Sequence, residues 1–296
     1  MMDPAVAAPP PASDGGSWAD RLRQIDRVEL GLTMTLAMIA ISMHEMTWYT
    51  QLGVMTLAVS ALVIRPLQWN PLLWFGLVVV FLVSFRATWF QQNNHDYLKT
   101  YWCAAVGLSL LAASPRQALA WNARIVIGLC FLFATLWKVL SPDFLNGEFF
   151  HYFLLQDTRF ELIARFLGGV SPAELAPGRT ERVLYSAFGD PAAGTAVAHA
   201  ARVGWISPLL TWWTVLMEGL VAAAFLSPLG TFLSKWRDVA LVVFMVSTYI
   251  IAPILFFAWI LCGMGVVQAE PARGRLGLAL YIGVFVLILV RFYVPV

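Results

Sequence analysis

The chain has 296 residues, of which 60% are hydrophobic and only 12% are charged, and its formal net charge is +2. A soluble domain carries about twice that share of charged residues. The composition therefore excludes a soluble enzyme, a nucleic-acid-binding protein and a disordered protein. Mean hydropathy is +0.74, and the apolar residues fall in blocks of about twenty, the length that a helix needs to cross roughly 30 Å of hydrocarbon. The sequence predicts an all-α, polytopic integral membrane helical bundle.

The first 17 residues are rich in Pro, Ala and Gly and have neither the basic nor the apolar region of a signal peptide. We expect a disordered N-terminal tail over 1–17 and a single transmembrane domain over 18–296. Arginines beside Trp18 and Ile25 in the stretch 18–28 are typical of an interfacial approach to the first span.

Apolar blocks predict spans at 29–47, 51–65, 71–90, 97–113, 121–140, 205–227 and 276–294. A further apolar run, 239–267, is long for one helix, and Pro253 near its middle would break or kink it. The count is about eight or nine transmembrane helices, depending on whether this run crosses once or twice. With nine crossings and a cytoplasmic N-terminus, about half of the 19 Lys and Arg residues lie on the inner side. We expect a multi-pass protein of a bacterial inner membrane, oriented in this way.

The segment 141–204 is the one sizeable stretch predicted to lie outside the membrane, on its outer face. An aromatic string over 149–155 followed by Asp157, Arg159 and Glu161 predicts one or two amphipathic helices on the outer interface. The cysteines, Cys103, Cys130 and Cys262, are three in number and have no C-x-x-C spacing, which favours buried core residues over redox chemistry. The histidines show no metal-ligand spacing, so no metal site is expected.

Polar residues within or beside hydrocarbon are costly unless they are paired or functional, and the predicted topology brings several to the outer face. His44 and Glu45 end the first span, and Arg86 ends the third. The loop 91–97 leads into the fourth, and Lys138 lies in the last turn of the fifth. Glu218 stands in the middle of an apolar helix and has no charged residue within ten positions on either side.

Each of these residues also has a simpler interpretation. Arg86 and Lys99 can extend to lipid headgroups, and Lys138 can do the same or form a structural ion pair, with Asp143 close behind it in the sequence. The remaining candidates have equally ordinary roles: helix capping for Asn93 and Asn94, an interfacial position for His44, and a structural hydrogen bond for Glu218.

A functional interpretation follows from the same placement. A lysine at the edge of hydrocarbon has its charged form disfavoured and can act as a base. Asparagine amides and a histidine nearby can stabilise a developing oxyanion. A cavity with an apolar floor and a polar rim suits an amphipathic ligand such as a quinone.

Two strings resemble a known family. Asn93-Asn94-His95-Asp96-Tyr97-Leu98 is similar to the N-N-H-x-Y-L signature of vitamin K-dependent γ-glutamyl carboxylases and of the bacterial HTTM (horizontally transferred transmembrane) domains. The stretch 134–147, which contains Lys138, resembles the A-G-x-x-K-L…D-W-x-x-G element of that family. Glu218 resembles a glutamate of the helix that follows it in the family, so that the resemblance covers about 90–250.

The resemblance implies that Lys138 is a catalytic base that deprotonates a quinone cofactor in its reduced form, as vitamin K hydroquinone is deprotonated in the carboxylases. It also implies that Asn94 and His95 line the quinone or substrate pocket. The ligand-binding residues that we predict are Asn93, Asn94, His95, Tyr97, Arg86, Glu218 and His44.

This sequence departs from the family pattern at Thr135, where the family has glycine, and at Met245, where it has histidine. The carboxylases also continue into a large soluble domain, so we expect a protein partner that supplies it, besides membrane lipids. Two alternatives stay open. One is a non-catalytic accessory or scaffold subunit of a larger complex, and the other is a proton-coupled transporter that uses Glu218 and a helix broken at Pro253.

Overall fold

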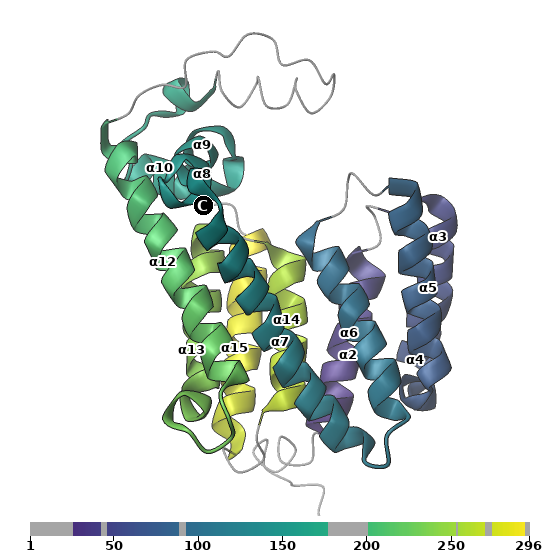
Figure 1. Ribbon diagram of the computed structural model, residues 1–296. Helices are drawn as coiled ribbons and strands as arrows, with labels where there is room; N and C mark the ends of the chain where they lie inside the picture. The colour runs from purple at the N-terminus through teal and green to yellow at the C-terminus, as the bar shows by residue number, and fades with distance from the viewer. Residues whose placement is uncertain are drawn as a thin grey trace, which may run out of the picture.

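The computed structural model describes residues 26–42, 46–88, 93–176, 201–252, 254–269 and 274–293, and these residues are largely helical, with no strand among them (Figure 1). The longer helical segments are α2 (Arg27–Ile41), α3 to α4 (Trp48–Val63, with a π-helical stretch at Met55–Val59), α5 (Pro71–Thr88), α6 (Asn94–Leu110), α7 (Pro115–Leu140), α12 (Ala201–Leu226), α13 (Phe232–Ile251), α14 (Leu255–Gln268) and α15 (Gly274–Tyr293). The shorter ones are η3 (Arg65–Trp69), α8 (Pro142–Leu145), α9 (Glu148–Gln156), η5 (Thr158–Phe160) and α10 (Glu161–Phe166).

The all-α prediction is confirmed for the described residues. The apolar run 239–267 divides into α13 and α14 on either side of position 253, as the proline there predicts. Two described helices, Pro115–Leu140 and Arg202–Leu226, are long and apolar enough to cross a membrane, and further apolar helices are shorter. The predicted tail 1–17 and the candidate His44 lie outside the described residues.

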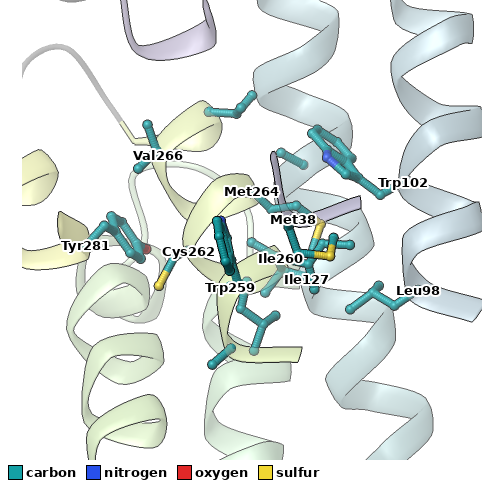
Figure 2. Packing of buried hydrophobic residues seen from close by; sticks show 14 of the residues in the cluster. Met38, Leu98, Trp102, Ile127, Trp259, Ile260, Cys262, Met264, Val266 and Tyr281 are labelled. Atoms are coloured by element: carbon teal, nitrogen blue, oxygen red, sulfur yellow. The ribbon is translucent and has the colours of Figure 1, made fainter. Parts of the chain in front are cut away.

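Helix α14 lies at the centre of the main hydrophobic core, and nearly all of its side chains are buried. Around it Figure 2 shows Met38 of α2, Trp102 of α6, Ile127 of α7 and Tyr281 of α15. A helix that is apolar on all sides lies in the core of a protein or crosses a membrane. The sequence of α14, LFFAWILCGMGVVQ, meets this condition.

Helices α2 and α14 approach so closely that the contact requires glycine. A Cβ atom built on Gly31 would lie 2.9 Å from the backbone oxygen of Gly263 and against a methyl group of Val267. Small residues at helix contacts allow backbones to approach and gain van der Waals packing, which is the main attraction between helices in an apolar medium. Gly31 therefore fixes the distance between the first helix and the central one.

At the start of α2, Asp26 is the N-cap. Its carboxylate accepts a hydrogen bond of 3.0 Å from the N–H of Val28, and it also forms an ion pair with Arg116 at the start of α7. Burial raises the pKa of Asp26, but the hydrogen bonds from Arg116 and from the backbone of α2 outweigh that effect and hold this pKa below its ordinary value of 3.8. The cap thus joins α2 to α7.

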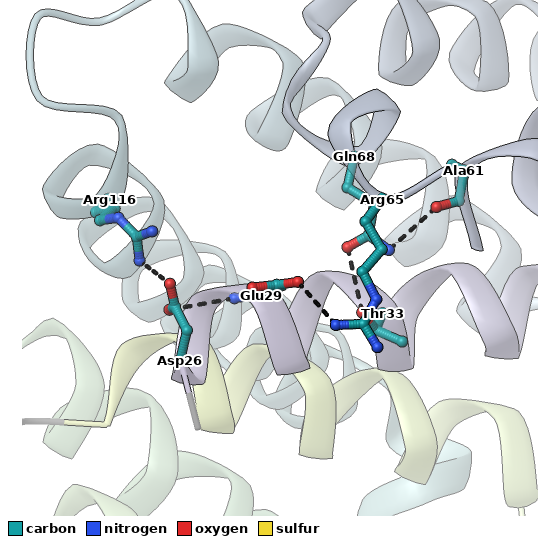
Figure 3. A network of polar contacts seen from close by, with 7 residues as sticks. All are labelled: Asp26, Glu29, Thr33, Ala61, Arg65, Gln68 and Arg116. Atoms are coloured by element: carbon teal, nitrogen blue, oxygen red, sulfur yellow. Dashed lines mark hydrogen bonds and ion pairs between the residues drawn. The ribbon is translucent and has the colours of Figure 1, made fainter. Parts of the chain in front are cut away.

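A second polar connection on the same helix joins α2 to the segment that precedes α5 (Figure 3). Arg65 lies 3.5 Å from a carboxylate oxygen of Glu29. The hydroxyl of Thr33 donates to Gln68 at 3.2 Å, and the Gln68 amide donates to the Ala61 carbonyl at 3.1 Å. These bonds satisfy backbone and side-chain groups where the chain turns between α4 and α5.

A smaller hydrophobic cluster lies at the opposite end of the bundle, where α8, α9 and α10 pack on the first half of α12. Phe144, Phe150 and Phe160 form its aromatic part, with the Phe150 and Phe160 rings 6.1 Å apart. The prediction of one or two helices in this stretch is confirmed by α9 and α10. Their position at a membrane interface stays a prediction.

We expect Gly31→Ala to destabilise the protein by about 1–3 kcal/mol, because the added methyl group must push α2 away from α14. The measurement is the thermal unfolding midpoint in detergent. Gly283→Ala is the control, since a Cβ atom at Gly283 meets nothing within 4 Å. Equal unfolding midpoints for the two variants would contradict the close contact.

Acid should weaken the contact between α2 and α7. Because the folded-state pKa of Asp26 is lowered, its contribution is complete above about pH 4 and is lost as pH falls through the folded-state value. Solvent screening keeps the charge contribution to about 0.5–1 kcal/mol. Asp26→Asn retains a capping side chain. In detergent unfolding, this variant should therefore lose less stability between pH 7 and pH 3 than the wild type does. If the wild type and Asp26→Asn lose the same stability on acidification, the acid sensitivity belongs to other groups.

Candidate functional site

A largely buried ion pair joins α7 to α12. The Nζ of Lys138 donates to both carboxylate oxygens of Glu218, at 2.6 Å and 2.9 Å. The two side chains are 16% and 9% exposed. The Lys138 ammonium also lies 5.5 Å from the centre of the Phe144 ring, within cation–π range. The sequence predicted that a buried Glu218 needs a partner, and Lys138 is that partner.

A second cation of α7 fixes the other end of the same helix pair. Arg124 donates through Nε to the carbonyl of Phe225 at 2.7 Å and through Nη2 to the carbonyl of Ser227. These carbonyls lie where α12 ends and have no partner within the helix. Arg124 and Lys138 are about four turns apart on α7, so both face α12. The register between α7 and α12 is therefore set by a cation at each end.

Side chains from three helices surround Glu218. Cys130 of α7 and Tyr249 of α13 both lie close enough to interact electrostatically with it. The rings of Phe131 and Phe244 are 4.7 Å apart, and Phe244 is 6.0 Å from Tyr249. These ring contacts join α7 to α13.

Lys99 and Asp96 form the second buried ion pair, near the start of α6. The Lys99 Nζ lies 2.7 Å from the Asp96 carboxylate and 3.3 Å from the Ser42 hydroxyl. It also lies 5.3 Å from the centre of the Phe81 ring. His95 is buried beside the pair, with its Nε2 atom 3.8 Å from Asp96. This cluster joins α2, α5 and α6.

The remaining residues of the predicted site have varied surroundings. Asn93 is the N-cap of α6, and its N–H donates to Asp96 at 3.0 Å, as in a capping box. Asn94 is exposed at the first position of α6, and Arg86 is exposed near the end of α5. Tyr97 is half-exposed, with its ring 4.9 Å from that of Phe85.

Two of the simpler interpretations need correction. Lys99 does not extend to a headgroup region, because its side chain is 3% exposed and bound to Asp96. The carboxylate that pairs with Lys138 belongs to Glu218, 80 positions along the chain, whereas Asp143 is exposed. In both cases the lysine binds a carboxylate that is close in space within the protein, and this interaction is more favourable than solvation of the ammonium group at the surface.

Lys138, Glu218, His95 and Asn93 therefore lie in two separate centres, whereas Arg86 and Asn94 are exposed. Lys138 and Glu218 form one with Phe144, and His95 lies in the other with Asp96 and packs at 6.0 Å on the Phe256 ring of α14. Helices α6 and α7 are neighbours joined by a short turn, so both centres lie toward the same end of the bundle (Figure 1). Each ion pair is formed within one centre: Lys138 pairs with Glu218, and Lys99 pairs with Asp96.

Sequence reasoning missed Lys99 and Tyr249. For Lys99 the available signal was its i, i+3 spacing from Asp96 on a predicted helix. Tyr249 gave no signal, since a tyrosine at the end of an apolar helix is an ordinary interfacial residue. Its proximity to Glu218 arises only when α12 and α13 pack together.

The described residues contain no group of three or more His, Cys, Asp or Glu side chains placed to hold a metal ion. No protein-family model, curated protein or solved structure matches the chain. The resemblance to the carboxylase family accordingly rests on the residues of this chain alone.

A lysine hydrogen-bonded to a carboxylate in a poorly solvated place can move a proton. The pair exists as ammonium and carboxylate or as amine and carboxylic acid, and low polarity reduces the difference between these forms. The neutral amine can accept a proton from a bound hydroxyl group. The pair Lys138–Glu218 therefore has the parts of a base with a proton store.

Removing one partner of this pair should destabilise the protein strongly. Glu218→Gln or Lys138→Met leaves the other charge buried, which costs about 3–5 kcal/mol. The double variant Lys138→Met with Glu218→Leu should recover most of that loss in a detergent unfolding assay. As a control, Arg165→Met breaks an exposed i, i+4 pair with Glu161 and should cost less than about 1 kcal/mol. Independent, additive losses at the two positions would show that the charges are not coupled.

Proposed function

We propose that this protein is a polytopic helical membrane protein of the carboxylase-like type, with an outward-facing site around Lys138 and Glu218. It binds a quinone or another lipid-like molecule there and acts together with a protein partner. The observation that carries the proposal is the buried Lys138–Glu218 ion pair beneath an apolar surface.

The membrane location is supported by large apolar side chains exposed on the longest helices. Soluble monomers rarely expose contiguous patches of this kind. They include Leu129, Phe133, Leu136, Trp137 and Leu140 of α7, and Trp205, Leu209, Trp212, Leu216 and Leu220 of α12. The central helix α14, in contrast, is buried by its neighbours. Both features fit a bundle that is surrounded by lipid.

The described residues contain nine longer helical segments, two of which are by themselves long and apolar enough to span a membrane, and we propose that all nine cross it. Arg27, Arg116 and Lys235 stand at the starts of α2, α7 and α13, at the end of the bundle opposite to Lys138. Under the positive-inside rule, this distribution of basic residues favours a cytoplasmic N-terminus and a Lys138 centre on the outer side. We propose a bacterial inner membrane as the location.

The surroundings of the ion pair support a lipophilic ligand. Val139 and Leu140 of α7 and Trp213 and Leu216 of α12 are exposed on the two helices that carry the paired residues. These side chains offer an apolar surface to a molecule dissolved in the bilayer, and the largely buried charged pair lies on the same two helices. A ring that bears hydroxyl or carbonyl groups and is attached to a hydrocarbon tail fits both surfaces.

The resemblance to the carboxylases gives the pair its proposed task. A hydroquinone, when bound, supplies an acidic hydroxyl and the electrons for reaction with O₂. Lys138, in its amine form, accepts the hydroxyl proton, and Glu218 holds the proton that Lys138 gave up before. Asn94 and His95, on α6, are proposed to approach the substrate from the neighbouring centre.

A second function is favoured by one observation. Lys138 and Arg124 together hold α12 against α7, so the pair can serve as a purely structural clamp in a non-catalytic accessory subunit. Under this alternative the protein would co-purify with a partner in mild detergent and would bind no quinone.

Protein purified in membranes or lipid nanodiscs should bind a vitamin K-type naphthoquinone. With its hydroquinone and O₂ it should form the epoxide and water. Lys138→Met should abolish epoxide formation, because no other amine lies next to Glu218 in the part of the chain that the structure describes. Lys235→Met, which removes an exposed lysine from the opposite end, is the matched control. Absence of epoxide from the wild type would reject the catalytic proposal, and absence of quinone binding would leave the accessory alternative.

A further inference from the structure

Two buried hydroxyl groups near the Lys138–Glu218 pair have no hydrogen-bond partner among the described residues. They are the Tyr249 hydroxyl on α13 and the Thr211 hydroxyl on α12. Tyr249 is 1% exposed and Thr211 is 0% exposed. Burying such a group without a partner costs about 1–3 kcal/mol, so proteins rarely keep one that nothing occupies.

Both hydroxyl groups lie on α12 or α13, two helices that pack against each other. Thr211 precedes Glu218 by about two helical turns on the same face of α12, and the buried Val215 lies between them. Tyr249 lies close enough to Glu218 to interact with it electrostatically. Because α12 and α13 are antiparallel and joined by a short turn, the end of α13 lies level with the first half of α12. Tyr249 and Thr211 therefore lie on one side of the ion pair.

Buried aromatic rings pack beside Tyr249. The Phe244 ring lies 6.0 Å from Tyr249 and 4.7 Å from Phe131, and both phenylalanines are buried. Aromatic side chains favour stacked or edge-on contacts with another ring. The tyrosine hydroxyl is thus a hydrogen-bond donor at the edge of an aromatic surface.

We propose that Tyr249, assisted by Thr211, donates a hydrogen bond to a ring oxygen of the ligand bound at the Lys138–Glu218 centre. The ligand class is an aromatic or quinonoid ring with a carbonyl or hydroxyl oxygen. This inference rests on the proposed function, since it assigns a second contact to the same ligand. Lys138 exchanges a proton with one oxygen of the ring, and Tyr249 holds the other end of the ligand in place. Tyr249 is accordingly a binding residue, and no bond changes at it.

The test measures naphthoquinone binding in nanodiscs by tryptophan quenching, together with the unfolding midpoint. Tyr249→Phe should raise the Kd about tenfold, equivalent to about 1.4 kcal/mol, while the unfolding midpoint stays equal or rises because an unsatisfied group is removed. Thr211→Val should raise the Kd by a smaller factor.

Matched controls exist for both substitutions. The buried Tyr281 hydroxyl donates to Asp238 at 2.9 Å, so Tyr281→Phe should lower the unfolding midpoint and leave the Kd unchanged. The Thr214 hydroxyl, on the same helix as Thr211, donates to the Leu210 carbonyl at 2.8 Å. Thr214→Val should leave the Kd unchanged.

The outcomes separate this inference from the function on which it rests. Wild-type binding that Tyr249→Phe leaves unaltered overturns the inference and leaves the proposed function standing. A lowered midpoint for Tyr249→Phe with an unaltered Kd shows that an internal water satisfies the hydroxyl, and also overturns it. A wild type that binds no naphthoquinone overturns the proposed function and the inference together.

Discussion

The buried ion pair between Lys138 and Glu218 is the constraint on which the arrangement of the longest helices depends. A charge that is removed from water must find an opposite charge or lose its ionised form. Glu218 lies in an apolar stretch of α12, and Lys138 lies in the last turn of α7. Their pairing selects one register of the two helices. Arg124 at the other end of α7 selects the same register through the carbonyl groups that end α12.

The central helix imposes a constraint of another kind. Since α14 has apolar residues on all sides, hydrophobic burial alone leaves its rotation undefined, and close contacts must define it. Gly31 on α2 and Gly263 on α14 provide one such contact. At its end, Gln268 is bonded to Arg237 at 2.8 Å and to Asp238 at 2.5 Å. A fully satisfied polar cluster is directional, so it determines which face of α14 meets α13.

The helices could be predicted from the sequence because each is a local property of a run of apolar residues. The division of the run into α13, which ends at Ile251, and α14, which begins at Leu255, was also predictable from a local signal, the proline in the sequence between them. The site was predictable only in part. That Glu218 needed a partner followed from its isolation, but the choice of Lys138 over a nearer residue depends on how α7 and α12 pack. Lys99 was assigned to the surface because burial, in contrast to helix formation, is set by distant segments such as Ser42.

The same pair has to stabilise the fold and, in the proposed function, to take part in proton transfer. These roles conflict only if Lys138 must leave Glu218 in order to react. Nζ carries three hydrogens as an ammonium group, and Glu218 engages it from one side, while the Phe144 ring lies on another. A ligand oxygen can therefore contact Nζ while the ion pair persists. Proton transfer to Glu218 then converts the ion pair into a hydrogen-bonded amine and carboxylic acid, which prepares Lys138 as a base without moving either helix.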